Sequence, residues 1–125
     1  MKNHSFYDSF RHAFDGIKTL LKEERNMRIH LGMTILVIMC SVIFSLSTLK
    51  KAVVILLCAL VICAELINTA IENVIDMNTA VFNMYAKRAK DLAAASVLVL
   101  SIASAIIGLI IFVPYGIDFL KYIAL

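Results

Sequence analysis

Five polar side chains recur at helical spacing inside an apolar stretch of this 125-residue chain. They are Glu65, Asn68, Thr69, Glu72 and Asp76, and on a helix they fall within about one third of a turn of one another. We call this face the polar stripe. An unpaired ionisable side chain inside a bilayer costs at least ~2.5 kcal/mol, so several on one face need partners, a cation or a water-filled cavity. The stripe therefore predicts an inward-facing surface with a chemical or ion-pairing role.

Further charges stand before the first apolar run and after the stretch that carries the stripe, and all of them are expected at the same membrane boundary as the stripe. They are Glu23, Glu24, Arg25 and Arg28 on one side, and Lys87, Arg88, Lys90 and Asp91 on the other. Phosphoryl transfer requires carboxylates that hold Mg²⁺, a base beside a hydroxyl group and a lysine for phosphate oxygens, because it depends mostly on positioning and charge neutralisation. On spacing alone, an ion-pair network that only ties helices together is almost as good an interpretation.

Several other kinds of site are disfavoured. The four glycines form no Walker loop and no protein-kinase loop, so a kinase with this sequence does not have a soluble kinase fold. The cysteines and histidines lack the spacing of metal ligands, and we interpret them as packing or interfacial residues. A formal net charge of +3, confined to the flanks of the apolar segments, argues against binding to nucleic acid.

The hydrophobic content indicates a membrane protein, since 62% of the residues are hydrophobic and only 17% are charged. Residues 31–49 and 92–113 contain no charge, and each run is long enough to cross a hydrocarbon core of about 30 Å. We expect a single all-α domain over residues 1–125, with transmembrane helices at about 29–49, 52–77 and 89–113. Pro114 is expected to end the last span, because proline interrupts the hydrogen-bond ladder of a helix.

The N-terminal segment has a different pattern. Phe6, Phe10, Phe14, Ile17 and Leu21 recur at steps of three or four residues, and charged residues stand between them. This spacing predicts an amphipathic helix over about residues 5–25 that lies in the membrane interface. The alternative is a helix whose apolar face packs on its own protein.

The basic residues predict an orientation in the membrane. Lys and Arg stand at positions 2, 11, 18, 22, 25, 28, 87, 88 and 90 on one side, and at 50, 51 and 121 on the other. By the positive-inside rule, the N-terminal helix and the loop around residues 78–90 are cytoplasmic. The polar stripe then opens toward the cytoplasm.

Two segments carry a resemblance to a known family. Residues 64–76 read AELINTAIENVID and residues 86–95 read AKRAKDLAAA, and together they resemble the signature of the prokaryotic diacylglycerol kinases. Residues 26–31, NMRIHL, and Gly16 extend the resemblance over nearly the whole chain. It implies three transmembrane helices plus a surface helix, an interleaved or domain-swapped homotrimer, and active sites between subunits at the cytoplasmic interface of the bacterial plasma membrane.

The resemblance also implies roles for individual residues. Glu65 matches the catalytic base that takes the proton of the lipid hydroxyl, and Asn68 matches its polar companion. Glu24 and Glu72 match the carboxylates that hold the Mg²⁺ of the ATP complex. The positions that match nucleotide-binding residues are Glu24, Glu72, Asp76, Lys90 and Asp91.

Two positions depart from the family pattern. Phe82 and Asn83 stand where the loop commonly carries a Tyr-His or Phe-His pair, and Ser5 does not match an early basic residue of the enterobacterial members. No nucleotide contact is carried over to these positions.

The acceptor is expected to be a membrane lipid alcohol. The segments NMRIHL and INTAIE look more like the undecaprenol kinases of Gram-positive bacteria, which favours undecaprenol, with diacylglycerol as the alternative. A small proton-coupled transporter is an alternative from another class. A transporter predicts a carboxylate near the middle of the membrane, whereas the acids here cluster toward the cytoplasmic end.

Overall fold

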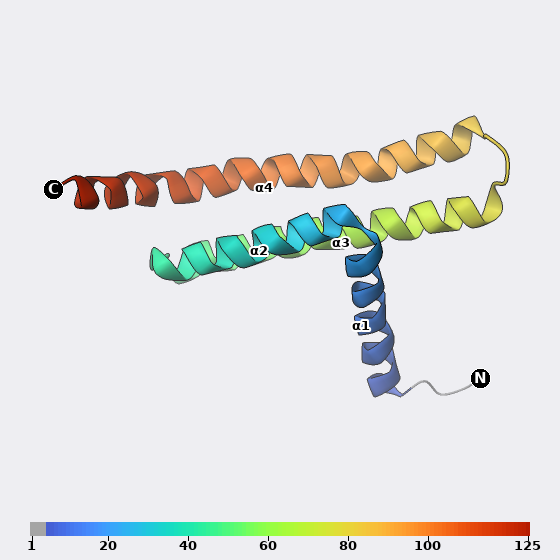
Figure 1. Cartoon of the computed structure of the whole chain (residues 1–125), viewed down its shortest axis with the longest axis horizontal. Coiled ribbons are helices and arrows are strands. Elements are labelled where there is room, and N and C mark those ends of the chain that lie inside the picture. Colours follow the sequence, from blue (N-terminus) through green and yellow to red (C-terminus); the bar gives the residue numbers. More distant parts are fainter. Residues whose placement is uncertain (1–4) are drawn as a thin grey trace.

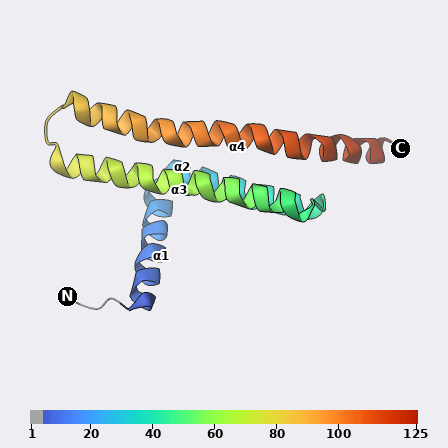
Figure 2. The ribbon, with the colours of Figure 1, turned by 180° about the vertical axis from the view of Figure 1, so that it is seen from behind.

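The computed structural model describes residues 5–125, which form four helices. They are α1 (Phe6–Glu23), α2 (Arg25–Ile43), α3 (Thr48–Asn78) and α4 (Met84–Ala124). Lys2, one of the basic residues that predict the orientation, and His4, one of the histidines interpreted as packing or interfacial residues, lie outside the described residues. Figure 1 and Figure 2 show α2, α3 and α4 running alongside one another, with α1 standing crosswise to them.

The three long helices α2, α3 and α4 are each long and apolar enough to cross a membrane. Both α2 and α4 pack on α3, which is therefore the central helix of the bundle. Most of the large apolar side chains on these helices are exposed, and the main buried apolar cluster is Leu46, Val54 and Ile111. Such surface is unfavourable in water, and it suits contact with lipid or with further copies of the chain.

Helix α1 is amphipathic, as the sequence predicts, and the aromatic part of its apolar face does not pack on the rest of the chain. Phe6, Phe10 and Phe14 are 82%, 53% and 60% exposed. The helix begins with a capping box, in which Ser5 accepts a bond from the Asp8 amide and the Asp8 carboxylate accepts one from the Ser5 amide. The exposed aromatic face favours the interfacial helix over the alternative of a helix packed on its own protein.

A sharp break separates α1 from α2. Glu24 has an extended backbone, with φ −103° and ψ 120°, and its amide still donates to the Leu20 carbonyl oxygen at 2.8 Å. The Arg28 guanidinium donates to the carbonyl oxygens of Leu21 and Lys22 at 3.2 and 3.0 Å. Arg28 therefore caps the end of α1 from the first turns of α2 and fixes the direction of the break.

At the other end of the bundle, the turn between α2 and α3 packs against α4. The predicted first span reaches residue 49, whereas α2 ends at Ile43 and α3 begins at Thr48. Helix α2 does not continue because Ser45 adopts φ +50°. Helix α3 starts at Thr48 because the Ser47 hydroxyl accepts from the Lys50 amide as its N-cap. The Phe44 ring contacts Phe112, Tyr115 and Phe119 of α4.

The expectation that Pro114 ends the last helix is wrong, because α4 continues through Pro114 to Ala124. Proline removes only one backbone hydrogen bond, and membrane helices tolerate this loss when neighbouring contacts compensate. Tyr115 directly follows the proline, and its hydroxyl accepts from Lys50 Nζ at 3.1 Å. The contacts of Tyr115 and Phe119 with Phe44 hold this end of α4 against the α2–α3 turn.

Replacing Tyr115 tests this contact. We expect Tyr115→Phe to lower the free energy of unfolding by about 1 kcal/mol, because it removes one hydrogen bond and keeps the ring that Lys50 Nζ approaches at 4.9 Å from its centroid. Tyr115→Leu should cost more, since it removes the ring as well. Denaturant unfolding in detergent micelles measures both values, and equal stability of all three proteins would contradict the assigned role.

Candidate active site

The polar stripe lies on the inner face of α3, as its spacing predicts. Glu65, Asn68 and Thr69 are 3%, 9% and 7% exposed, Glu72 is half-buried and Asp76 is exposed. Burial therefore decreases from the middle of α3 toward the loop that joins it to α4. This gradient arises because both α2 and α4 pack along the middle of α3. The C-terminal part of α3 projects beyond the start of α2 and is no longer covered by it (Figure 1).

Asn68 is fixed by one bond and leaves one polar atom without a partner. Its amide nitrogen Nδ2 donates to Glu72 Oε1 at 3.2 Å, one helical turn away. Its other polar atom, Oδ1, is buried and accepts no hydrogen bond from the described residues. Since a buried acceptor without a donor is costly, this atom is available to a ligand or to another chain.

Glu65 is surrounded by polar groups from two helices. Helix α2 places the Asn26 amide within hydrogen-bonding reach of the Glu65 carboxylate and brings the His30 ring close to it. Glu24 and Glu72 are near enough to interact with Glu65 electrostatically. Sequence reasoning missed the proximity of His30, although Asn26 and His30 stand four residues apart and so share one face of α2.

A groove of about 320 Å³ opens beside Glu65. It runs over α3 between α2 and α4, and its apolar walls come from both flanking helices. Its lining residues are Asn26, Ile29, His30, Glu65, Asn68, Ala94, Val97, Leu98 and Ser101. Glu65 therefore combines low exposure with direct access to a partly apolar cavity, which is the setting of a base that acts on an alcohol.

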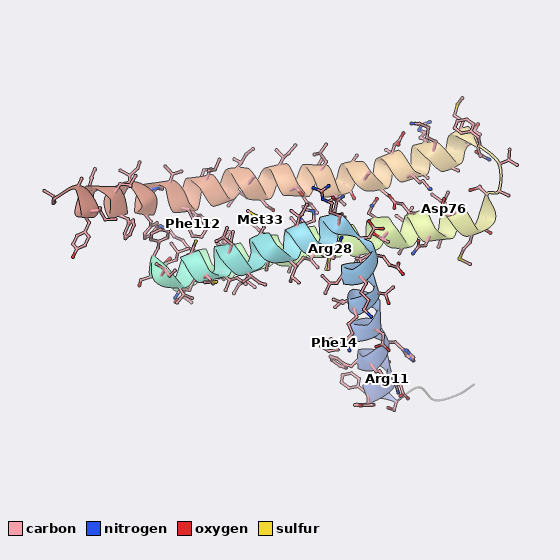
Figure 3. The ribbon with its side chains drawn as sticks, in the orientation of Figure 1. Arg11, Phe14, Arg28, Met33, Asp76 and Phe112 are labelled. Atoms are coloured by element: carbon pink, nitrogen blue, oxygen red, sulfur yellow. The ribbon has the colours of Figure 1, made fainter. Side chains whose placement is uncertain are left out.

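Asp76, Lys90, Lys87 and Asp91 lie at the loop end of α3 and α4. Lys90 of α4 is ion-paired with Asp76 of α3, and Lys87 Nζ donates to Asp91 Oδ2 at 2.5 Å. A second pocket, of about 320 Å³, lies against the α3–α4 loop and includes Asp76, Lys87 and Lys90 in its lining. Figure 3 shows Asp76 on the side of α3 that faces α4, whereas Arg28 lies at the break between α1 and α2.

The two carboxylates expected to hold Mg²⁺ both lie near Glu65. Glu24 is the residue at the break between α1 and α2, and Glu72 stands on the polar stripe; both are half-buried. Residues 5–125 contain no group of three His, Cys, Asp or Glu side chains arranged to hold a metal ion. Two carboxylates suit Mg²⁺ that arrives with a nucleotide, because this ion takes most of its remaining ligands from phosphate oxygens and water.

The positions that depart from the family pattern have structural roles. The Asn83 side-chain oxygen accepts from the amides of Tyr85 and Ala86 at 2.8 and 3.3 Å, so Asn83 is the N-cap of α4. Ser5 is the N-cap of α1. Phe82, which directly precedes Asn83, is 80% exposed. The only signal for these roles in the sequence is the preference of Asn and Ser for cap positions.

The sequence that forms this arrangement of helices and side chains matches a known protein family. The profile of the prokaryotic diacylglycerol kinases matches residues 11–112, which include the polar stripe, Glu24, Lys90 and Asp91. The chain belongs to this family of membrane proteins, and the resemblance inferred from its residues is confirmed.

Three relatives of known name are similar over most of the chain. The undecaprenol kinase of Bacillus subtilis is 39% identical over 109 residues, which cover 87% of this chain and 89% of that protein. The diacylglycerol kinase of Synechocystis sp. is 37% identical over 107 residues, covering 85% of this chain and 61% of that protein. The diacylglycerol kinase of Helicobacter pylori is 36% identical over 88 residues, covering 68% and 66%.

Arg28 is expected to matter for activity through Glu24, because its two hydrogen bonds fix the break at which Glu24 stands. If Glu24 helps to hold the Mg²⁺ of an ATP complex, as the resemblance implies, we expect Arg28→Ala to raise the KM for Mg·ATP by roughly tenfold, since misplacement of a site residue by about 1 Å has large effects. Arg25→Ala is the matched control, because it removes a cation from the same turn and leaves both bonds in place. An equal KM for Mg·ATP in Arg28→Ala and Arg25→Ala would show that Arg28 does not position Glu24.

Proposed function

We propose that this chain is an integral membrane lipid kinase that transfers the γ-phosphate of Mg·ATP to the hydroxyl group of undecaprenol, giving undecaprenyl phosphate. The observation that carries the proposal is the position of Glu65, which is 3% exposed and lines a groove between membrane-length apolar helices. An alcohol dissolved in the bilayer can reach such a groove from the side. The 39% identity to an undecaprenol kinase supports this acceptor.

The reaction requires one proton transfer and one exchange of bonds at phosphorus. The hydroxyl of the lipid donates its proton to Glu65 as its oxygen bonds to the γ-phosphorus of ATP. The bond between that phosphorus and the bridging oxygen breaks, and ADP leaves with the electron pair. Asn68 holds Glu72 through the bond at 3.2 Å and so keeps the second carboxylate beside Glu65. Burial of the groove limits the access of water, which would otherwise compete with the lipid.

Glu24 and Glu72 are the residues that hold Mg²⁺ in this proposal. The bound ion supplies charge neutralisation for the phosphate oxygens of ATP. Both residues interact electrostatically with Glu65, so the carboxylates that would hold the metal lie near the base. Half-burial of the two carboxylates leaves them open to a nucleotide that enters from the cytoplasm.

Asp76, Lys90 and Asp91 are the proposed nucleotide contacts at the open end of the site. The Lys90–Asp76 pair has side chains that are 35% and 62% exposed, and exposed ion pairs contribute at most about 1 kcal/mol. Lys90 can therefore exchange Asp76 for a phosphate group at little cost. The positive-inside rule supports a cytoplasmic position for this end in the bacterial plasma membrane.

A homotrimer with interleaved helices and sites shared between subunits is part of the proposal. The single chain leaves large apolar side chains exposed along α2, α3 and α4, and the Asn68 Oδ1 atom lacks a partner. Contact with neighbouring copies would cover such surface and add groups to the groove.

Diacylglycerol is the second candidate acceptor, because the relatives from Synechocystis and Helicobacter are diacylglycerol kinases at 37% and 36% identity. A competition assay separates the two acceptors. Purified protein receives labelled Mg·ATP and equal mole fractions of undecaprenol and a diacylglycerol in mixed micelles. We expect label in undecaprenyl phosphate in excess over phosphatidic acid, and the opposite excess would assign the chain to diacylglycerol.

A further inference from the structure

Two buried hydroxyl groups of α4 are not used by the fold. Ser101 Oγ and Ser104 Oγ have no hydrogen-bond partner among residues 5–125. Serine in an apolar helix ordinarily donates to a carbonyl of the preceding turn, as Ser41 and Ser96 do at 2.7 and 2.6 Å. Ser101 and Ser104 therefore retain a donor for a group outside the single chain.

Only one of these two hydroxyls belongs to a residue that lines the Glu65 groove, namely Ser101. Glu65 and Asn68 reach the groove from α3, and Ser101 reaches it from the neighbouring helix α4. Asn68 is itself 9% exposed with an unpartnered Oδ1 atom. The groove thus holds two buried polar groups without partners in otherwise largely apolar walls, which is the arrangement of a site for a small polar group on an apolar ligand.

The hydrogen-bonding capacities of these groups fit an alcohol. A hydroxyl group has one proton to donate and lone pairs that accept. The Glu65 carboxylate and Asn68 Oδ1 only accept, so either can receive the proton of the alcohol. The oxygen of the alcohol then needs a donor, and the hydroxyl of Ser101 is a buried donor in the groove without a partner among residues 5–125.

The position along the helix favours a lipid alcohol over a soluble one. Ser101 lies ten residues after Asp91, which corresponds to about 15 Å along α4 from the charged end of the bundle. The intervening wall of the groove is formed by Ala94, Val97 and Leu98. A headgroup that reaches this depth belongs to a molecule whose remaining part is soluble in the membrane.

We propose that Ser101 binds the hydroxyl oxygen of the lipid acceptor and directs the proton of that hydroxyl toward Glu65. This inference rests on the proposed kinase function and adds a substrate-binding residue to it. Neither the spacing of the polar stripe nor the family resemblance pointed to Ser101, which lies in a largely apolar run of α4. The competing explanation for its free hydroxyl is a hydrogen bond to a second copy of the chain.

Three variants test the proposal in mixed micelles with undecaprenol as the acceptor: Ser101→Ala, Ser101→Thr and Ser104→Ala. We expect Ser101→Ala to lower kcat/KM for the lipid by roughly two- to tenfold, the loss of one hydrogen bond, while KM for Mg·ATP stays within about twofold. Ser101→Thr keeps a hydroxyl and should retain most of the activity. Ser104→Ala is the matched control, because it removes an equally buried and unpartnered hydroxyl that does not line the groove.

The outcomes separate this inference from the function on which it rests. Equal lipid kinetics for Ser101→Ala and Ser104→Ala, in a wild-type protein that phosphorylates the lipid, would overturn the role of Ser101 and leave the kinase function intact. Loss of the oligomer in Ser101→Ala, measured by size-exclusion chromatography with light scattering, would assign the hydroxyl to a contact between copies. Absence of phosphate transfer in the wild-type protein would remove both the function and the inference.

Discussion

Glu65→Gln is expected to lower kcat for lipid phosphorylation by at least 10²-fold, because an amide cannot accept the proton of the lipid hydroxyl. The substitution preserves the size of the side chain, which is 3% exposed, and it removes a buried carboxylate. Folding and assembly should therefore be retained. Initial rates of labelled phosphate transfer to undecaprenol, with micelle composition held constant, measure the effect.

Glu23→Gln provides the matched control for this variant, because it neutralises an exposed carboxylate at the end of α1, away from the groove. The affinity of Glu65→Gln for Mg·ATP should remain within a few-fold of the wild-type affinity. Titration with a fluorescent ATP analogue measures it. A Glu65→Gln protein with more than about a tenth of the wild-type rate would show that another group takes the proton.

Glu72→Gln is expected to weaken the use of Mg²⁺ by at least about tenfold, since it removes one of the two carboxylates assigned to the ion. The amide oxygen of Gln can still accept the bond from Asn68 Nδ2, which is 3.2 Å from Glu72 Oε1 in the native chain. This variant therefore removes charge and leaves the Asn68 contact. Initial rates as a function of free Mg²⁺ at saturating ATP measure the change.

Comparison with Glu72→Ala separates the two functions of this side chain. Glu72→Ala removes the charge and also leaves Asn68 Nδ2 without its acceptor, so it should lower kcat further than Glu72→Gln and reduce stability by about 1–3 kcal/mol. An unchanged dependence on Mg²⁺ in both variants would remove Glu72 from the metal site and leave Glu24 as the only carboxylate assigned to it.

The part of the site on α3 could be predicted from sequence because a single helix positions it. The 3.6-residue period places Glu65, Asn68 and Glu72 on one face without any knowledge of tertiary structure, and the structure buries the first two and half-buries the third. The approach of Glu24 depends on the break between α1 and α2. No local pattern encodes that distance, so only the family resemblance singled out Glu24 among the charges that precede the first apolar run.

His30 and Ser101 were not predicted as site residues for a related reason. Each lies in or beside a largely apolar segment, and polar residues there more often satisfy their hydrogen bonds within the helix or at an interface. The packing of both α2 and α4 on α3 brings the two residues to one groove. Packing between helices depends on the shape of many apolar side chains, which one sequence does not reveal.

The error at Pro114 has a similar origin. The local rule that proline ends a helix considers only the lost hydrogen bond and the clash with the preceding turn. In the folded chain, the residues on either side of Pro114 are anchored: Phe112 and Tyr115 contact Phe44, and Tyr115 also bonds with Lys50. These contacts join segments far apart in the sequence and keep α4 helical beyond the proline.

The most direct test of the central claim is the stoichiometry of phosphate transfer by the purified protein in mixed micelles that contain undecaprenol. Labelled γ-phosphate is counted in the lipid phase and in the aqueous phase, and ADP is measured in the same reaction. The proposed function predicts one undecaprenyl phosphate for each ADP, with little free phosphate and no lipid label in Glu65→Gln. ADP that appears with free phosphate and an unlabelled lipid, or no ADP at all with undecaprenol or diacylglycerol present, would contradict it.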